Sequence, residues 1–204
     1  MNDYSYASLP DSLIVVGALV GFHDEERRVA RLIRGQLLAR LISRSALGER
    51  ISQDALVEDA ASVLQNQPRR DALILSACLV TWSSERISVL AAGQFEVWLA
   101  QDSGLSQILV GSSVYQLATE AGLAVERYLK HVCTAALSAD RSKSVSQYVE
   151  MAYSPTDTLV ITVGDVEPGW VVGRARALGR GPVVFAVDEG ADLRLVAPLL
   201  CRRP

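Results

Sequence analysis

The first quarter of the chain combines one apolar run with two helical patterns. Leu13–Val20 has no polar side chain and ends at Gly21, which is typical of a strand buried on both faces. A helix is predicted over 24–45, because its first residues are acidic and carboxylates complement the positive end of the helix dipole. Its spacing predicts an apolar face made of Val29, Leu32, Ile33, Leu37, Leu41 and Ile42. A second helix is predicted from about Gln53 to Gln65, where the sequence Asn-Gln-Pro stops it.

The middle of the chain changes to short apolar or alternating segments, which favour strands. These segments are Ala72–Trp82, Ile87–Ala92, Phe95–Ala100 and Leu105–Val110. Because short polar or glycine-containing spacers separate them, we expect a meander of four antiparallel strands. Residues 113–145 mix loop and helix patterns.

The last quarter continues with strands and one further helix. Tyr148–Tyr153 and Thr158–Val163 are expected to pair as strands around Ser154-Pro155, and a helix is predicted over Gly169–Leu178. Two final strands are expected at Pro182–Val187 and Leu193–Val196. No repeat or linker divides the chain, so residues 1–204 are predicted to form one domain. Antiparallel strands with segregated helices predict an α+β sandwich.

Composition narrows the class of protein. The chain has 204 residues, of which 50% are hydrophobic, and a net charge of −3, so it is neither disordered nor a general nucleic-acid binder by charge. Three isolated cysteines and two histidines are too few for a structural zinc site, and unpaired cysteines suit a reducing cytoplasm. The apolar run Leu13–Val20 lacks a basic leader and is too short to span a bilayer. We therefore expect a cytoplasmic protein with no membrane partner.

Five short segments carry a further pattern. Asn2-Asp3 precedes the first apolar run, and Val16–His23 (VGALVGFH) leads into the long helix. Ala92–Leu99 (AGQFEVWL) lies in the meander, and Asp157–Asp165 (DTLVITVGD) precedes the later helix. Arg180–Val183 (RGPV) stands before the last strands. In this order, and with these helices between them, the segments resemble the motifs of the metal-dependent PPM-type (protein phosphatase 2C-like) serine/threonine phosphatases.

The resemblance covers nearly the whole chain and implies a fold and a site. The fold is a two-sheet antiparallel β-sandwich flanked by helices (αββα), here truncated at the N-terminus because the chain begins almost at the first metal motif. In the family, carboxylates at the motif positions hold two divalent metal ions. The resemblance places the corresponding positions at Asp3, Ala18, Gln94, Gly164 or, with a one-residue slip, Asp165, and Arg180.

Most of these positions lack a carboxylate. Alanine, glycine and glutamine cannot supply the negative charge that holds Mg²⁺ or Mn²⁺, and Arg180 would repel a cation. Asp3 and Asp165 alone are too few for a binuclear centre. The resemblance therefore implies a pseudophosphatase without metal or cofactor, which acts as a protein- or peptide-binding accessory or regulatory protein. Its groove would be lined by Ala18, Gln94, Glu96, Gly164 and Arg180.

Other side chains are candidates for contact with a partner. Arg27, Arg31 and Arg34 lie along one side of the first helix, which is typical of an exposed basic face. Glu96 and Trp98 share one face of a strand, where Trp98 is either a core residue or a contact residue.

Three alternatives to an inactive protein-binding monomer stay open. The chain is an active, divergent metal-dependent phosphatase or other hydrolase if Asp3, His23 and Asp165 converge. It is a nucleic-acid-binding regulator if the arginine-rich helix 24–45 binds phosphate groups, although its overall charge disfavours this. A homodimer through an exposed sheet edge or through the meander is a further arrangement.

Overall fold

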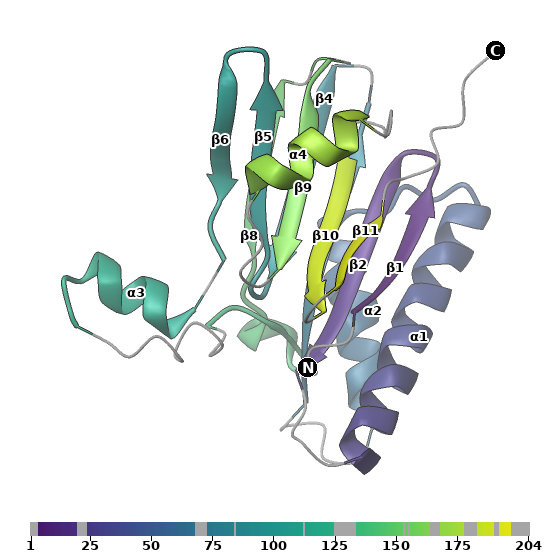
Figure 1. Ribbon diagram of the computed structural model, residues 1–204. Coiled ribbons are helices and arrows are strands. Elements are labelled where there is room, and N and C mark those ends of the chain that lie inside the picture. Colours follow the sequence, from purple (N-terminus) through teal and green to yellow (C-terminus); the bar gives the residue numbers. More distant parts are fainter. Residues whose placement is uncertain are drawn as a thin grey trace.

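The computed structural model shows two β-sheets packed face to face, with helices on the outside (Figure 1). It describes residues 4–19, 24–67, 73–83, 85–111, 113–124, 134–152, 154, 156–163, 168–177, 183–189 and 192–196. Within this part of the chain, no helix is both long and apolar enough to cross a membrane. The arrangement confirms the predicted α+β sandwich.

Sheet A is built mainly from the first half of the chain and is antiparallel throughout. Its strand order is β1–β2–β3–β4–β8, and the short β7 also pairs with β3. The strands are β1 (Tyr4–Leu9), β2 (Ser12–Leu19), β3 (Ile74–Trp82), β4 (Arg86–Ala92), β7 (Leu137–Ser138) and β8 (Gln147–Ala152). The sequence analysis did not identify β1, whose mixture of tyrosine, serine and alanine has no clear alternation of apolar and polar positions.

Sheet B contains the remaining strands, in the order β11–β10–β9–β5–β6. They are β5 (Glu96–Gln101), β6 (Gly104–Leu109), β9 (Thr158–Val163), β10 (Val183–Glu189) and β11 (Asp192–Val196). All neighbours are antiparallel except β9 and β10, which are parallel because α4 (Pro168–Ala177) lies between them in the chain. In Figure 1, α4 crosses the strands of sheet B on the face that is turned away from sheet A.

Two predicted strand pairings are wrong. The expected four-stranded meander is two hairpins in different sheets, because the chain leaves sheet A after β4 and enters sheet B at β5. Gly93 makes this crossing possible with a φ of +124°, a conformation that other residues rarely adopt. The strands on either side of Ser154 do not pair with each other either: β8 lies in sheet A and β9 in sheet B.

Helices α1 (Asp24–Ala46) and α2 (Gln53–Gln65) cover sheet A and begin and end close to the predicted residues. The short α3 (Val114–Glu120) projects away from both sheets, and a 3₁₀ turn forms at Arg141–Lys143 (Figure 1). The buried face of α1 differs from the prediction, since Leu32 and Ile42 are 54% and 43% exposed. The side chains that α1 buries are Ala30, Ile33, Arg34, Leu37, Leu38 and Leu41.

Strand β2 supplies two separate hydrophobic cores. Leu13 and Val15 belong to the core between the sheets, while Ile14 and Val16 belong to the core between sheet A and the helices. All four side chains are fully buried. This explains why the run has no polar position: successive side chains of a strand point to opposite faces, and both faces are covered.

Candidate functional site

The predicted site positions that the structure describes lie at one end of the sandwich. Ala18 pairs with Leu75 at the end of β2, and its neighbour Gly17 pairs with Ser76. Gly93, directly after β4, lies so close to Ser76 that a Cβ added to the glycine would be 2.5 Å from the Ser76 Cβ. Gln94 follows, so the end of β2, the start of β3 and the turn after β4 meet.

Sheet B reaches the same end of the sandwich. Glu96 begins β5 two residues after Gln94 and pairs with Thr162 near the end of β9. Val163 is the last residue of β9 and immediately precedes Gly164. The strand register therefore brings positions 18, 94 and 96 to one end of the sandwich, together with the residue before Gly164. That these positions line a common groove stays a prediction.

An aromatic pair packs against the inner side of this end. Tyr4 and Phe95 stand edge to face, with ring centroids 5.8 Å apart. Gly17 makes room for the tyrosine: a Cβ at this position would lie 2.6 Å from Tyr4 Cε1 and 2.4 Å from Ser76 Oγ. Ser76 is 2% exposed, and its hydroxyl has no hydrogen-bond partner among the described residues.

The polar side chains described at this end do not fit a binuclear metal centre. Gln94 is half-buried, and Glu96, the carboxylate closest to it in the sequence, is half-buried on the outer face of sheet B. Within the described part of the chain, no three His, Cys, Asp or Glu side chains lie close enough to hold a metal ion. One carboxylate and one neutral amide do not supply the charge that two divalent cations require.

Several predicted positions lie outside the described residues. These are Asp3, His23, Gly164, Asp165 and Arg180, and the side chains of Ala18 and Arg27 are likewise not described. The proposed convergence of Asp3, His23 and Asp165 therefore stays a prediction, as does the assignment of Arg180 to the groove.

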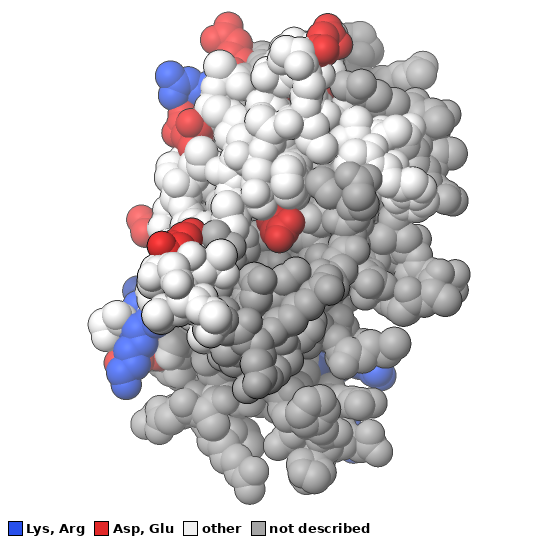
Figure 2. Space-filling model, turned by 60° about the vertical axis from the view of Figure 1, so that its left-hand side comes forward, with Lys and Arg blue, Asp and Glu red and all other residues white. Residues whose placement is uncertain are grey.

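The arginine face predicted on α1 needs a correction. Arg34 is only 3% exposed and belongs to the buried side of the helix, whereas Arg28 and Arg31 are exposed. The prediction is wrong for Arg34 because α1 packs on sheet A with a face rotated away from the one expected. On the face shown in Figure 2, the described charged side chains are scattered and form no basic patch.

Trp98 lies on the outer face of sheet B. Its strand neighbours Val97 and Leu99 point into the core between the sheets, so Trp98 and Glu96 point away from it. Trp98 is half-buried and pairs with Val160 of β9 and Gln107 of β6. It is therefore not part of the core between the sheets.

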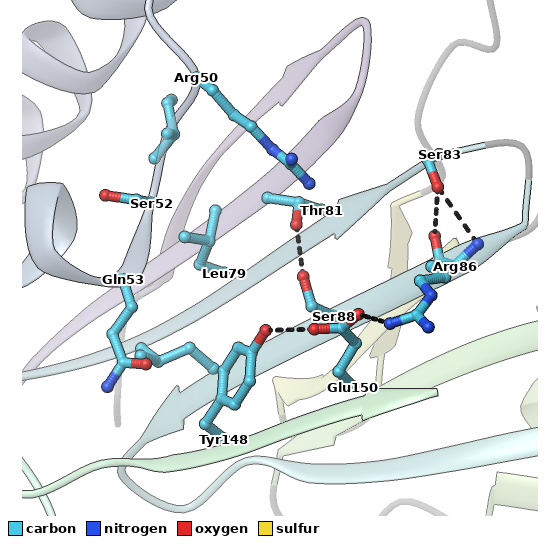
Figure 3. Close-up of a pocket in the computed structure, with 12 residues that line it drawn as sticks. Arg50, Ser52, Gln53, Leu79, Thr81, Ser83, Arg86, Ser88, Tyr148 and Glu150 are labelled. Carbon is cyan, nitrogen blue, oxygen red and sulfur yellow. Dashed lines mark hydrogen bonds and ion pairs between the residues drawn. The ribbon is translucent and has the colours of Figure 1, made fainter. Parts of the chain in front are cut away.

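A hollow on the opposite face of sheet A was not predicted. It lies beside the start of α2, over β3, β4 and β8 (Figure 3). Residues from four separate chain segments line it, and each segment contributes only two or three polar side chains. No local sequence motif marks such a site, because it exists only after the strands have paired.

No protein-family model matches the chain, and no curated protein matches it by sequence. Solved structures do match. The serine/threonine phosphatase PstP/Ppp of Mycobacterium tuberculosis aligns with a TM-score of 0.61 and 13% identity over 78% of this chain and 70% of that chain. The PPM Ser-Thr phosphatase MsPP of Mycobacterium smegmatis, in complex with cacodylate, aligns with a TM-score of 0.59 and 14% identity, covering 86% and 79%.

A third match extends over almost the whole chain. A Stage II Sporulation E family protein from Thermanaerovibrio acidaminovorans aligns with a TM-score of 0.54 and 11% identity over 95% of this chain and 98% of that chain. Identities this low establish the fold and not the activity. The sheet order, the helices on sheet A and these matches together show that the chain has the fold of the PPM-type serine/threonine phosphatases.

Proposed function

We propose that the chain is a phosphatase-like domain that does not hydrolyse phosphate esters and that binds a protein or peptide as an accessory or regulatory protein. The observation that carries this proposal is the mismatch between fold and donor set. The strands that meet at the end of the sandwich are present, yet positions 18 and 164 are alanine and glycine, and Gln94 is neutral. A two-metal mechanism requires carboxylates that fix the ions and leave a metal-bound water to attack phosphorus.

Hydrolysis of p-nitrophenyl phosphate with Mn²⁺, together with calorimetric Mn²⁺ titration, tests the absence of activity. We expect neither metal-dependent turnover nor Mn²⁺ binding by the native chain. A matched variant that carries Ala18→Asp, Gly164→Asp and Arg180→Asp restores three carboxylates, and we expect it to bind Mn²⁺ more tightly than the native chain. Turnover by the native chain that disappears on addition of a chelator would contradict the proposal.

An active, divergent phosphatase is the second candidate, because the matched PstP/Ppp and MsPP structures are themselves named as phosphatases. Asp3, His23 and Asp165 would then have to converge. This candidate predicts Mn²⁺-dependent turnover that Asp3→Ala and Asp165→Ala each abolish, while Asp102→Ala, in the turn between β5 and β6, leaves it unchanged. Turnover that survives both substitutions would exclude this arrangement.

The binding role has a test of its own. Trp98 and Glu96 lie together on the outer face of sheet B, and half-buried tryptophans are frequent anchors of protein interfaces. Peptides selected from a displayed library against the native domain are expected to lose affinity for Trp98→Ala and to keep it for Trp170→Ala, an exposed tryptophan on α4. Peptides that bind the native chain and Trp98→Ala equally would rule out this surface as the binding site.

A further inference from the structure

The hollow over β3, β4 and β8 exists because the helices cover sheet A incompletely. Helices α1 and α2 make most of their contacts with β1, β2, β3 and β7. On β4, Leu90 and Ala92 belong to the core beneath the helices, whereas Ser88 is half-buried and Arg86 is exposed. The loop from Arg50 to the first residue of α2, Gln53, forms one wall, and the three strands form the floor. The resulting volume is about 460 Å³, which is in the range of sites for small organic molecules.

One half of the hollow is apolar. Leu79, Leu90 and Ile51 line it, and each is at most 4% exposed. Tyr148 of β8 stands beside them with its ring half exposed to solvent. The three aliphatic side chains themselves expose almost no surface, so the ring of Tyr148 is the apolar group that a small ligand would contact.

The other half contains hydroxyl groups with spare hydrogen-bond donors. Thr81 Oγ1 and Ser88 Oγ are 2.6 Å apart, and they form a hydrogen bond with each other and with no other described group. Two hydroxyls that share one hydrogen bond leave one O–H proton without an acceptor. Either hydroxyl can carry this spare proton, and since Thr81 is 7% exposed and Ser88 is half-buried, both lie in the wall of the hollow.

The charges in the hollow are unequal. Arg86 of β4 and Glu150 of β8 neutralise each other, and the Tyr148 hydroxyl donates a 3.1 Å hydrogen bond to the same carboxylate. Arg50 forms no ion pair within 4 Å among the described residues, and its charge acts on Glu150 only at longer range, whereas Arg40, Arg44, Arg86 and Arg141 each have at least one carboxylate within 4 Å. Figure 3 shows the Arg50 side chain reaching into the hollow towards Thr81.

The polar side chains around the floor of the hollow therefore offer more hydrogen-bond donors than acceptors. The guanidinium of Arg50, the spare hydroxyl proton of the Thr81–Ser88 pair and the amide of Gln53 all offer N–H or O–H groups. The Glu150 carboxylate is already occupied by Arg86 and Tyr148. A ligand that complements this set carries acceptor oxygens and a negative charge at one end and an apolar body at the other.

We propose that the hollow lined by Arg50, Thr81, Ser88 and Tyr148 is a binding site for a small organic anion, with a carboxylate or phosphoryl group on Arg50 and an aromatic or aliphatic body against the ring of Tyr148. The site lies on the helix-covered side of sheet A. It shares no residue with the end of the sandwich where Gln94 and Glu96 lie. It is independent of whether the chain hydrolyses phosphate esters.

The test uses two anionic probes and one neutral probe on the full chain. Phenylphosphonate carries a phosphoryl group that a phosphatase cannot release by hydrolysis, benzoate carries a carboxylate, and benzyl alcohol lacks the charge. Calorimetric titration gives the affinity, and backbone amide shifts in NMR spectra locate the site. We expect saturable binding of at least one anion, with the largest shifts at residues 50–53, 79–81 and 88–90.

Three variants connect the binding to the named groups. Arg50→Ala is expected to weaken the anion by about tenfold or more, because it removes a charged donor. Thr81→Val keeps the shape of the side chain and removes the hydroxyl, and is expected to weaken binding less. Arg31→Ala removes an exposed arginine from α1 and is expected to leave the affinity unchanged.

The possible results show which class of anion the hollow binds, or that it binds no anion. Tighter binding of phenylphosphonate than of benzoate assigns the site to phosphoryl compounds, and the reverse order assigns it to carboxylates. The proposal is overturned if neither anion saturates in the millimolar range, if benzyl alcohol binds as tightly, or if Arg50→Ala binds as the native chain does. Shifts confined to residues 94–96 would overturn it as well, because the anion would then occupy the other site.

Discussion

Gly17 is the residue whose replacement tests the packing at the end of the sandwich. We predict that Gly17→Ala lowers the free energy of unfolding by about 1–3 kcal/mol, because the added methyl group would overlap Ser76 Oγ and the Tyr4 ring. Gly35→Ala is the matched control. Nothing lies within 4 Å of a Cβ at position 35 on α1, so we expect this change to raise stability by about 0.5–1 kcal/mol. Urea unfolding measures both, and equal effects of the two variants would contradict the observed packing.

Cys78 makes a second prediction at the residue scale. The thiol is fully buried between the sheets, and this burial raises its pKa above the ordinary value. A thiol that stays protonated and shielded reacts slowly, since the thiolate is the nucleophile. In a Cys133→Ser, Cys201→Ser background, we expect Cys78 to react with dithionitrobenzoate only at the rate of unfolding. Ala39→Cys adds an exposed thiol on α1 for comparison, and equally fast labelling of both thiols in the native state would show that Cys78 is accessible.

Helices α1 and α2 are joined by an ion pair whose loss affects an element rather than a single residue. Arg44 Nε lies 2.7 Å from Asp59 Oδ2, and the Arg44 guanidinium also contacts Glu49 and Glu58. Hydrogen bonds to Asp59 and Glu49 raise the pKa of Arg44 above its ordinary value. We expect Asp59→Ala to destabilise the chain clearly more than Glu58→Ala, because the Asp59 side chain is 6% exposed and that of Glu58 is 50% exposed. Thermal unfolding of the two variants measures the loss of stability. Equal losses for Asp59→Ala and Glu58→Ala would mean that burial of the ion pair does not contribute to stability.

Strands β4 and β8 are linked on their outer face by Arg86 and Glu150. Hydrogen bonds from Arg86 and Tyr148 lower the pKa of Glu150 below its ordinary value of 4.5. The stabilisation by this carboxylate is therefore present above pH 4.5 and is lost as the pH falls through the lowered pKa of the folded state. In an NMR titration, Arg86→Ala should move the pKa of Glu150 back up, whereas Arg141→Ala should leave it unchanged. An unaltered value in Arg86→Ala would refute the link.

At the element scale, local patterns predicted the elements better than their partners. The helix at 53–65 and the strands around Cys78 and Val160 could be predicted from periodicity. The spacing of apolar side chains shows whether one face or both faces of an element are buried. The spacer Gly93-Gln94 looks like a hairpin turn, yet it carries the chain from one sheet to the other. Which sheet a strand joins depends on residues far away in the sequence, so the short spacer could not reveal it.

The candidate site shows the same limit. Positions 18, 94 and 96 lie at one end of the sandwich, and their role as a site stays a prediction that rests on comparing order along the chain with a known arrangement of strands. The sequence did not predict the hollow around Arg50, because its lining residues come from separate segments and form no local motif. Arg34 was misjudged because helical spacing defines which residues share a face but leaves open which face turns inward.

For the whole molecule, the sharing of sheet A between two cores predicts one cooperative unfolding transition. Val15 and Val16 are adjacent, yet each faces a different core. We expect Val15→Ala and Val16→Ala each to cost about 1–3 kcal/mol and to shift a single transition seen alike by far-UV circular dichroism and tryptophan fluorescence. Separate transitions for the two probes would show that the cores unfold independently and that the chain has two units.

The two-sided burial of β2 also bears on how the chain folds. Strand β1 immediately precedes β2 and pairs with it, whereas its covering layers follow later in the chain: α1 comes directly after it, and the strands of sheet B begin only at Glu96. In a partly folded chain that lacks these layers, β2 exposes an eight-residue apolar run, and we expect aggregation to begin there.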